Sequence, residues 1–183
     1  MKHLQTTILA IVFSIFALTT SVLSADLENT LYMDVKAGRV TIKLRPDLAP
    51  NHVAQIKKLT REGFYDGIVF HRVIPGFMAQ TGDPTGTGTG GSKYPDLKAE
   101  FTDTNFARGV LGMARSQNPD SANSQFFIMF DEGAFLNGQY TVFGEVTDGM
   151  EHIDAIKKGS KANNGQVDNP DKMIKLQVAA DAQ

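Results

Sequence analysis

The sequence contains no cysteine. This absence excludes a disulfide framework, a thiol nucleophile and any metal site built on cysteine ligands, and it also excludes a lipid anchor on an N-terminal cysteine. An excess of positive charge is missing as well, since 18 basic and 20 acidic residues give a formal net charge of −2. This balance gives no support for binding to nucleic acid or to an anionic membrane surface.

Long hydrophobic runs are also scarce, and the strongest one lies near the N-terminus. Residues 8–18 (ILAIVFSIFAL) are apolar except for one serine, with Lys2 before them and the small residues Ser24 and Ala25 after them. This pattern predicts a secretory signal peptide over residues 1–25, cleaved after Ser24 or Ala25. An uncleaved membrane anchor is the alternative, but this run is well short of the ~20 residues that span a bilayer.

The signal peptide predicts export, and a bacterial periplasm is the expected location. Secretion from the cell and anchoring by the uncleaved segment are the alternatives. In the periplasmic case the chain meets the membrane only through the signal segment before cleavage. The remainder, residues 26–183, is long enough for one domain with a substantial core.

Short segments with alternating or β-branched and aromatic residues predict strands at residues 31–35, 39–44, 68–74, 110–114, 126–130, 141–146 and 173–178. Pro50 is suited to the first turn of a helix. A second helix is predicted over residues 150–158, with Asp148 as its N-cap and Gly159 after its end. Many short strands and only two helices favour a mostly β fold, a closed β-barrel with the helices as lids.

A glycine-rich stretch follows the third predicted strand, and Gly86, Gly88 and Gly91 have the spacing of a dinucleotide-binding loop. That motif works only where the loop opens a helix, whose first amides receive the phosphates. Here Pro95 disfavours a helix just after the loop. We therefore expect no bound nucleotide, and we interpret residues 82–98 as a mobile surface loop.

Motifs for other chemistries are also absent. There is no G-x-S-x-G sequence for a serine nucleophile, no H-x-x-x-H pair for zinc and no calcium-loop spacing among the aspartates. His71 is interpreted as a structural residue of the barrel. We expect no metal and no cofactor.

Two strands carry polar side chains among apolar ones. On residues 68–74, alternation places Phe70, Arg72 and Ile74 on one face and His71 on the other. Strand position alone favours an arginine at a rim, with its stem over apolar surface and its head in solvent.

The second such strand covers the sequence SQFFIMF. Gln125, Phe127 and Met129 alternate with Phe126, Ile128 and Phe130. If the latter three fill the barrel, the outer face presents an amide, an aromatic ring and a thioether.

Five motifs occur along the chain in a fixed order: FHRVIPGFMAQTGD (70–83), GVLGMA (109–114), SQFFI (124–128), FLNGQYTVFGEV (135–146) and GM (149–150). Together they resemble the cyclophilins, a family of peptidyl-prolyl cis/trans isomerases, over residues 31–178. The resemblance implies an eight-stranded antiparallel barrel capped by two helices, with a substrate groove on its outside. The export signal and the compact loops look most like the periplasmic bacterial branch.

Carried over by position, the resemblance implies that Arg72 and Gln80 are catalytic. It places the substrate at Phe77, Met78, Ala114, Arg115, Ser116, Gln125, Phe127, Phe135, Leu136 and Tyr140. The expected partners are unfolded or partly folded polypeptides that contain proline, bound by a monomer that assists the folding of exported proteins.

Three positions depart from the pattern common in the family. Phe135 stands where many members have tryptophan, Tyr140 where they have histidine, and Arg115 where asparagine is common. Without the indole N–H, we expect weak binding of the immunosuppressant cyclosporin. Tyr140 can still form a pocket wall, so the departure does not argue against turnover.

A non-catalytic module that binds proline peptides, or acts as a chaperone on the same fold, is the alternative function. The presence of Arg72, Phe77, Gln80 and Phe127 favours the enzyme, because a degraded site would be expected to lose its arginine first.

Overall fold

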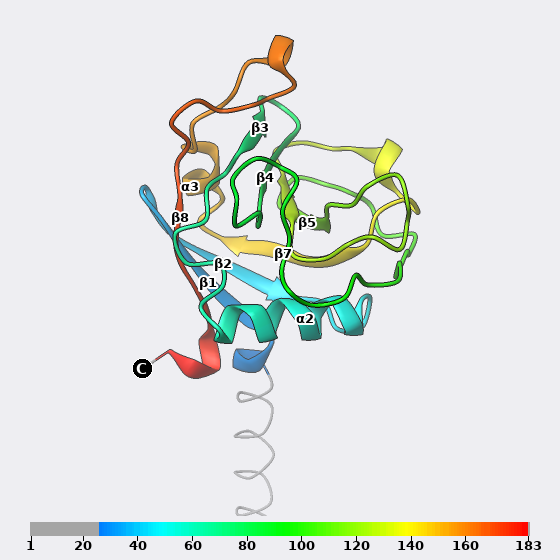
Figure 1. The fold of residues 1–183 in the computed structure, drawn as a ribbon. Coiled ribbons are helices and arrows are strands. Elements are labelled where there is room, and N and C mark those ends of the chain that lie inside the picture. Colours follow the sequence, from blue (N-terminus) through cyan, green and yellow to red (C-terminus); the bar gives the residue numbers. More distant parts are fainter. Residues whose placement is uncertain (1–25, 183) are drawn as a thin grey trace, which may run out of the picture.

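The computed structural model describes residues 26–182, and the predicted signal peptide lies outside the described residues. One curled sheet of eight strands dominates this part of the chain (Figure 1). The strands are β1 Thr30–Val35, β2 Gly38–Leu44, β3 Arg72–Ile74, β4 Met78–Thr81, β5 Val110–Met113, β6 Phe126–Met129, β7 Val142–Asp148 and β8 Met173–Val178. They pair antiparallel in the order β3-β4-β6-β5-β7-β2-β1-β8.

The eight-stranded antiparallel fold is confirmed, but the word "closed" overstates it. No ladder joins the edge strands β3 and β8 within the described residues; two isolated bridges, Val69 to Lys172 and Arg72 to Gln166, connect these edges instead. Between the bridges, the partner segment contains Asn169 at a φ of 50° and Pro170, which has no N–H for a ladder. The regular pairing is therefore interrupted where the barrel would close.

Strand β4 was not among the strands predicted from the pattern. A Pro75-Gly76 turn connects it to β3, with Gly76 at a φ of 71° and the Phe77 N–H donating to Ile74 O over 3.0 Å. This tight hairpin places Arg72 directly opposite Gln80. The Pro-Gly signal for a turn was present in the sequence, and it marks the place where the new strand begins.

The helices differ in how well the sequence predicted them. Helix α2, Pro50–Arg61, starts at the predicted proline and lies across one end of the sheet (Figure 1). Its first backbone N–H groups, on Asn51 and His52, donate to the carboxylate of Glu100. This carboxylate takes the place of the missing side-chain cap at Ala49.

Helix α3, Met150–Asp154, is shorter than the predicted 150–158. The residue before it is Gly149 in the left-handed region, with no side-chain cap, so the N-cap assigned to Asp148 is wrong. The Lys157 N–H donates to Asp171 Oδ2 over 2.8 Å. Because that bond replaces one to a helix carbonyl, the helix cannot continue to residue 158.

Apolar side chains form two clusters, one inside the curled sheet and one on its outer face. Phe126 and Ile128 belong to the inner cluster, while Phe127 and Met129 belong to the outer one, as predicted for β6. Phe70 departs from its prediction, since it lies in the inner cluster and not beside Arg72. Alternation fails there because β3 begins only at Arg72, and the backbone before it is irregular.

None of the helices among residues 26–182 is both long enough and apolar enough to cross a membrane.

Candidate active site

A hollow of about 280 Å³ lies on the outside of the sheet, over the outer apolar cluster. Its lining residues come from β3, β4, β6 and the loops beside them: Arg72, Phe77, Met78, Gln80, Ala114, Arg115, Phe127, Phe135, Leu136 and Tyr140. The structure thus brings together ten of the predicted site residues. The other two, Ser116 and Gln125, line a neighbouring hollow.

The floor of the hollow is apolar and well packed. Met78, Phe127 and Leu136 are 1%, 5% and 7% exposed. The Phe127 ring is stacked on Phe106 and forms a T-shaped pair with Tyr140, with 5.8 Å between ring centroids in both pairs. Such a floor can hold a small apolar ring but offers it no hydrogen bond.

Gly112 supports this floor, because it pairs with Phe127 across β5 and β6. A Cβ atom at this position would overlap the rings of both Phe127 and Phe106. We expect Gly112→Ala to lower the free energy of unfolding by about 1–3 kcal/mol and to raise KM for a proline peptide. Thermal unfolding and peptide titration measure the two effects.

The control for Gly112→Ala is the double variant with Phe127→Leu, which makes room for the added methyl group. It should recover part of the lost stability but not the peptide affinity. Unchanged peptide binding by Gly112→Ala would show that the Phe127 ring does not define the hollow.

Arg72 lies at the edge of the hollow with its guanidinium held on two sides. Its Nε and Nη2 donate to the backbone O and the Oδ1 of Asn164 over 3.0 and 2.9 Å. Its Nη1 donates to Gln80 Oε1 over 3.1 Å. Burial lowers the pKa of Arg72, an effect that the nearby Tyr140 opposes, but an arginine side chain remains charged in proteins.

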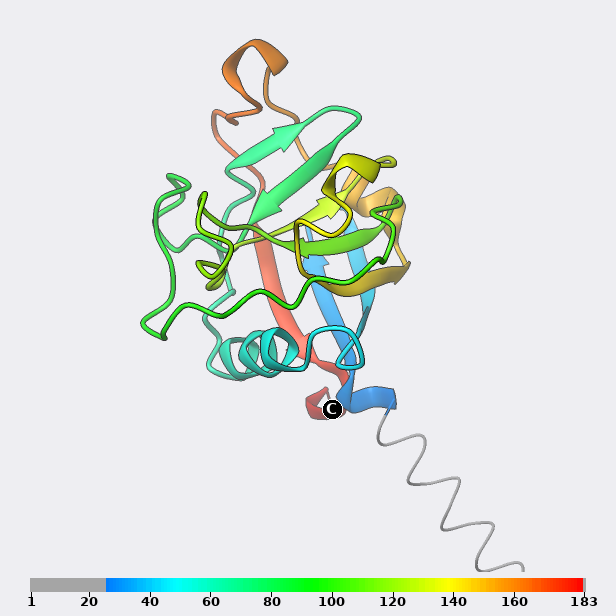
Figure 2. The same cartoon turned by 90° about the vertical axis from the view of Figure 1, so that its right-hand side faces the viewer.

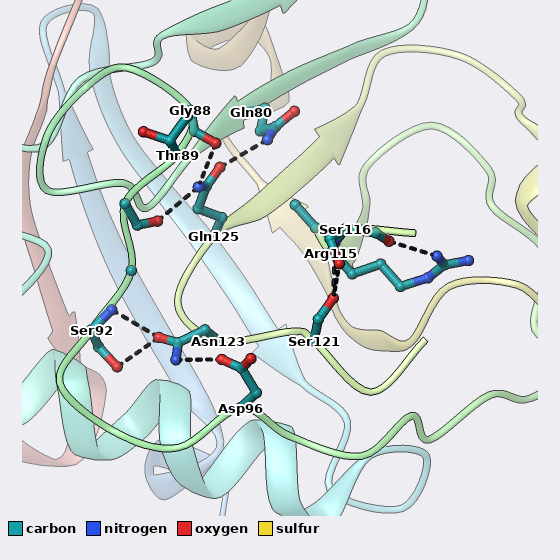
Figure 3. A pocket seen from close by; sticks show the side chains of 13 residues that line it. Gln80, Gly88, Thr89, Ser92, Asp96, Arg115, Ser116, Ser121, Asn123 and Gln125 are labelled. Carbon is teal, nitrogen blue, oxygen red and sulfur yellow. Dashed lines mark hydrogen bonds between the residues drawn. The ribbon is translucent and has the colours of Figure 1, made fainter. Parts of the chain in front are cut away.

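Gln80 is itself oriented by a chain of amides. Its Nε2 donates to Gln125 Oε1 over 2.9 Å, and Gln125 Nε2 donates to the backbone oxygens of Gly88 and Gly90 over 3.1 and 2.9 Å (Figure 3). This chain determines which end of the Gln80 amide faces Arg72. It thereby links the glycine-rich loop to the guanidinium.

The neighbouring hollow, about 540 Å³, lies between the glycine-rich loop and the segment that contains Ser116 and Gln125 (Figure 3). Gln80, Ala114 and Arg115 line both hollows, so the two are adjacent. An extended chain with its ring in the first hollow could pass over this boundary into the second.

The glycine-rich loop is wound around one buried carboxylate, a feature that the sequence did not predict. Asp83, only 1% exposed, accepts hydrogen bonds from the backbone N–H groups of Thr85, Thr87 and Gly88 and from the Thr85 hydroxyl. Burial would raise the pKa of Asp83, but the hydrogen bonds from Thr85, Gly90 and Gly88 together lower it to about 2. Amides of the kind that would surround a phosphate are here bound to the protein's own anion.

The side chain of Arg115 is hydrogen-bonded to backbone oxygens of the protein itself. Its Nε and Nη2 donate to Gln139 O over 3.2 and 2.9 Å, and its Nη1 donates to Ser116 O over 2.8 Å. The guanidinium also lies 4.5 Å from the centroid of the Tyr140 ring. The side chain therefore stabilises the rim between the two hollows.

Sequence reasoning missed Asn164, which binds Arg72 from 92 residues away. The Asn-Gly pair at residues 164–165 is a turn signal, but nothing in the sequence shows which side chain that turn approaches. A group of three or more potential metal ligands does not occur within residues 26–182.

Comparison with known proteins agrees with this geometry. The family model described as "Cyclophilin type peptidyl-prolyl cis-trans isomerase/CLD" matches residues 30–178. A probable peptidyl-prolyl cis-trans isomerase of Brucella suis biovar 1 (strain 1330) is 63% identical over 169 residues, 86% of either chain. Peptidyl-prolyl cis-trans isomerase B of Bacillus subtilis (strain 168) is 45% identical over 123 residues, 67% of this chain and 85% of the relative.

Solved structures show the same likeness. Cyclophilin AquaCyp293 from Hirschia baltica has a TM-score of 0.77 at 28% identity, covering 86% of this chain and 76% of that one. A Cryptosporidium parvum cyclophilin-type isomerase, crystallised in the presence of the dipeptide Ala-Pro, has a TM-score of 0.74 at 27% identity, covering 81% and 98%. The chain belongs to the cyclophilin-type peptidyl-prolyl cis-trans isomerases. The predictions of family, fold and enzyme class are confirmed.

Proposed function

We propose that the hollow beside Arg72 admits the proline ring of an X–Pro peptide, and that Arg72 catalyses rotation about its peptide bond. This proposal rests on one observation: Gln80 and Asn164 hold the partly buried guanidinium of Arg72 at the edge of an apolar hollow. The substrates proposed are unfolded or partly folded polypeptides that contain proline. The Ala-Pro dipeptide present with the Cryptosporidium parvum isomerase supports this substrate class.

The reaction needs no bond between heavy atoms to form or break. Its barrier of ~18–20 kcal/mol arises from amide resonance, which is lost as the bond twists. The twisted proline nitrogen becomes pyramidal and regains a lone pair that can accept a hydrogen bond. A donor placed at this nitrogen binds the twisted state better than the planar one, and only such selective binding accelerates the reaction.

Arg72 has donors left for this purpose. A guanidinium carries five N–H groups; three are used by Asn164 and Gln80, and the other two, one on each terminal nitrogen, have no acceptor within residues 26–182. In this mechanism one of them reaches the proline nitrogen. Met78, Phe127 and the other floor residues hold the ring as the fixed end of the rotation.

Gln80 and the exclusion of water complete the proposed mechanism. Gln80 holds Arg72 in place through its side-chain oxygen. In this mechanism the carbonyl group that precedes the proline rotates in the space beside Gln80. Displacing water from the hollow strengthens each polar contact of the guanidinium with the twisted amide. Uncatalysed exchange takes ~10–100 s, so even a modest preference for the twisted state produces a measurable acceleration.

Turnover separates this proposal from its alternative, a module that binds proline peptides without catalysis. Exchange of a short X–Pro peptide, followed by NMR or by a protease-coupled assay, measures the rate directly. We expect acceleration at sub-stoichiometric protein. Binding of the peptide with no acceleration would contradict the enzymatic role of the hollow and favour the binding module.

We further propose export to the periplasm and a role in the folding of exported proteins, supported by the signal-peptide pattern in residues 1–25. N-terminal sequencing of the protein from a periplasmic fraction should find Ala25 or Asp26 as the first residue. A membrane-bound protein that still begins at Met1 would contradict this and indicate the uncleaved anchor.

A monomeric state and weak binding of cyclosporin complete the proposal. The second of these is supported by Phe135, a residue that is 65% exposed at the rim and whose ring centroid lies 5.5 Å from that of Phe77. This ring supplies apolar contact but no N–H donor.

A further inference from the structure

The loop between α3 and β8 projects from one end of the barrel (Figure 2) and contains the residue that contacts Arg72 most extensively. We propose that this residue, Asn164, is a positioning residue for catalysis: it fixes the guanidinium of Arg72 so that its two free N–H groups face the hollow. This inference rests on the catalytic role proposed for Arg72.

Asn164 binds the guanidinium at two points with one residue. Its backbone oxygen accepts from Nε, and its side-chain Oδ1 accepts from Nη2. Two acceptors on one edge of a guanidinium match its planar fork and define its orientation as well as its location. Gln80 holds the opposite end through Nη1, so rotation of the group would break bonds at both ends.

The backbone of Asn164 is strained in a way that permits this contact. Its φ and ψ are 50° and 28°, in the left-handed region, which asparagine tolerates better than most residues. A right-handed residue here would change the direction of the backbone oxygen relative to the side chain. The strained conformation is therefore consistent with a requirement for both acceptors at once.

The loop is hydrogen-bonded to β3 at Val73, the residue that follows Arg72. The Val73 N–H donates to Gly165 O over 2.7 Å, and the Gly159 N–H donates to Val73 O over 2.9 Å. Two points of the loop, on either side of Asn164, thus contact one residue of β3, and a Cβ at Gly165 would overlap Ile74. These contacts fix the position of Asn164 relative to Arg72.

Loss of the Asn164 side chain should affect catalysis through the orientation of the Arg72 guanidinium. With Oδ1 removed, the Nη2 end loses its acceptor, and the guanidinium can adopt orientations in which no N–H points at the proline nitrogen. Loss of a fixed geometry lowers the rate of the chemical step even where the substrate still binds. The ring is held by the apolar floor, so peptide affinity should change little.

The test uses Asn164→Gly, which suits the left-handed backbone and keeps the backbone oxygen but removes Oδ1. We expect kcat to fall about tenfold, with KM and the unfolding temperature close to wild type. Asn164→Asp keeps an oxygen acceptor in a residue that tolerates this conformation, and it should recover most of kcat. Asn163→Gly is the matched control, because Asn163 bonds to Gln166 and not to Arg72.

A second readout follows the guanidinium itself. The Nη2–H resonances of Arg72, whose acceptor is Asn164 Oδ1, should be resolved and sharp in ¹⁵N NMR of the wild type and of Asn163→Gly, and broadened by rotation in Asn164→Gly. A wild-type kcat together with sharp Nη2–H resonances in Asn164→Gly would overturn the inference.

Arg72→Ala in the same assay separates this failure from failure of the proposed function. If Arg72→Ala loses activity while Asn164→Gly does not, only the role of Asn164 is wrong. If Arg72→Ala keeps full activity, the mechanism and the positioning role are both wrong.

Discussion

Replacing Arg72 by alanine is expected to lower kcat/KM for X–Pro isomerisation by about 10²–10³-fold, because loss of one transition-state donor has an effect of this size in other enzymes. The change corresponds to about 3–4 kcal/mol of transition-state stabilisation. Folding should be unaffected, since the side chain lies at the surface of the hollow and its partners Gln80 and Asn164 can turn to water. The exchange assay and a thermal unfolding curve measure both quantities.

Arg72→Lys should be almost as inactive as Arg72→Ala. Lysine keeps the positive charge but lacks the planar fork that bonds Asn164 and Gln80 while presenting further N–H groups. Comparison of Arg72→Lys with the wild type therefore separates the effect of the positive charge from that of the planar hydrogen-bonding group.

Arg39→Ala is the matched control for both variants, because Arg39 is an arginine paired with Asp34 on β1 and is absent from the lining of either hollow. We expect wild-type turnover from it. If Arg72→Ala and Arg39→Ala were equally active, Arg72 would have no part in the mechanism.

Replacing Asp83 by asparagine is expected to lower the free energy of unfolding by about 2–3 kcal/mol. The carboxylate is surrounded by N–H and O–H donors, and an amide would turn a donor of its own toward some of them. Activity should fall as well, by a few-fold, because Gly88 and Gly90 in this loop orient Gln125 and, through it, Gln80. Denaturant unfolding and the exchange assay test the two effects.

The contribution of the Asp83 carboxylate to stability should decrease as the pH falls. Its pKa is about 2 in the folded protein and 3.8 in its ordinary state, so the folded state favours the ionised form. The stabilisation is complete above pH ~4 and is lost as the pH falls through about 2, an amount of about 2 kcal/mol. The difference in stability between wild type and Asp83→Asn should therefore shrink as the pH falls from 5 toward 2.

Asp103→Asn is the control for the pH series, since Asp103 is an exposed aspartate in another loop. Its stability should follow that of the wild type at every pH. A stability difference for Asp83→Asn that stays constant from pH 5 to pH 2 would contradict the ionised, hydrogen-bonded carboxylate.

Local patterns in the sequence determined much of the fold, and the resemblance to a known family indicated most of the candidate site. The period of two along SQFFIMF predicted correctly which side chains of β6 face inward, because successive residues of a strand point to opposite faces. Pro50 marked the start of α2 for an equally local reason. The ordered motifs identified the family, and positions carried over from that resemblance include all ten residues that line the hollow.

The tertiary structure alone decided which distant groups meet. The glycine spacing could not show that the loop winds around Asp83, and the Asn-Gly turn could not show that Asn164 binds Arg72. Phe70 turned inward because its backbone is irregular, although strand alternation predicted the opposite. Periodicity and turn signals reflect bonds between near neighbours, whereas these contacts depend on how whole segments pack, and packing is settled only when the complete chain has folded.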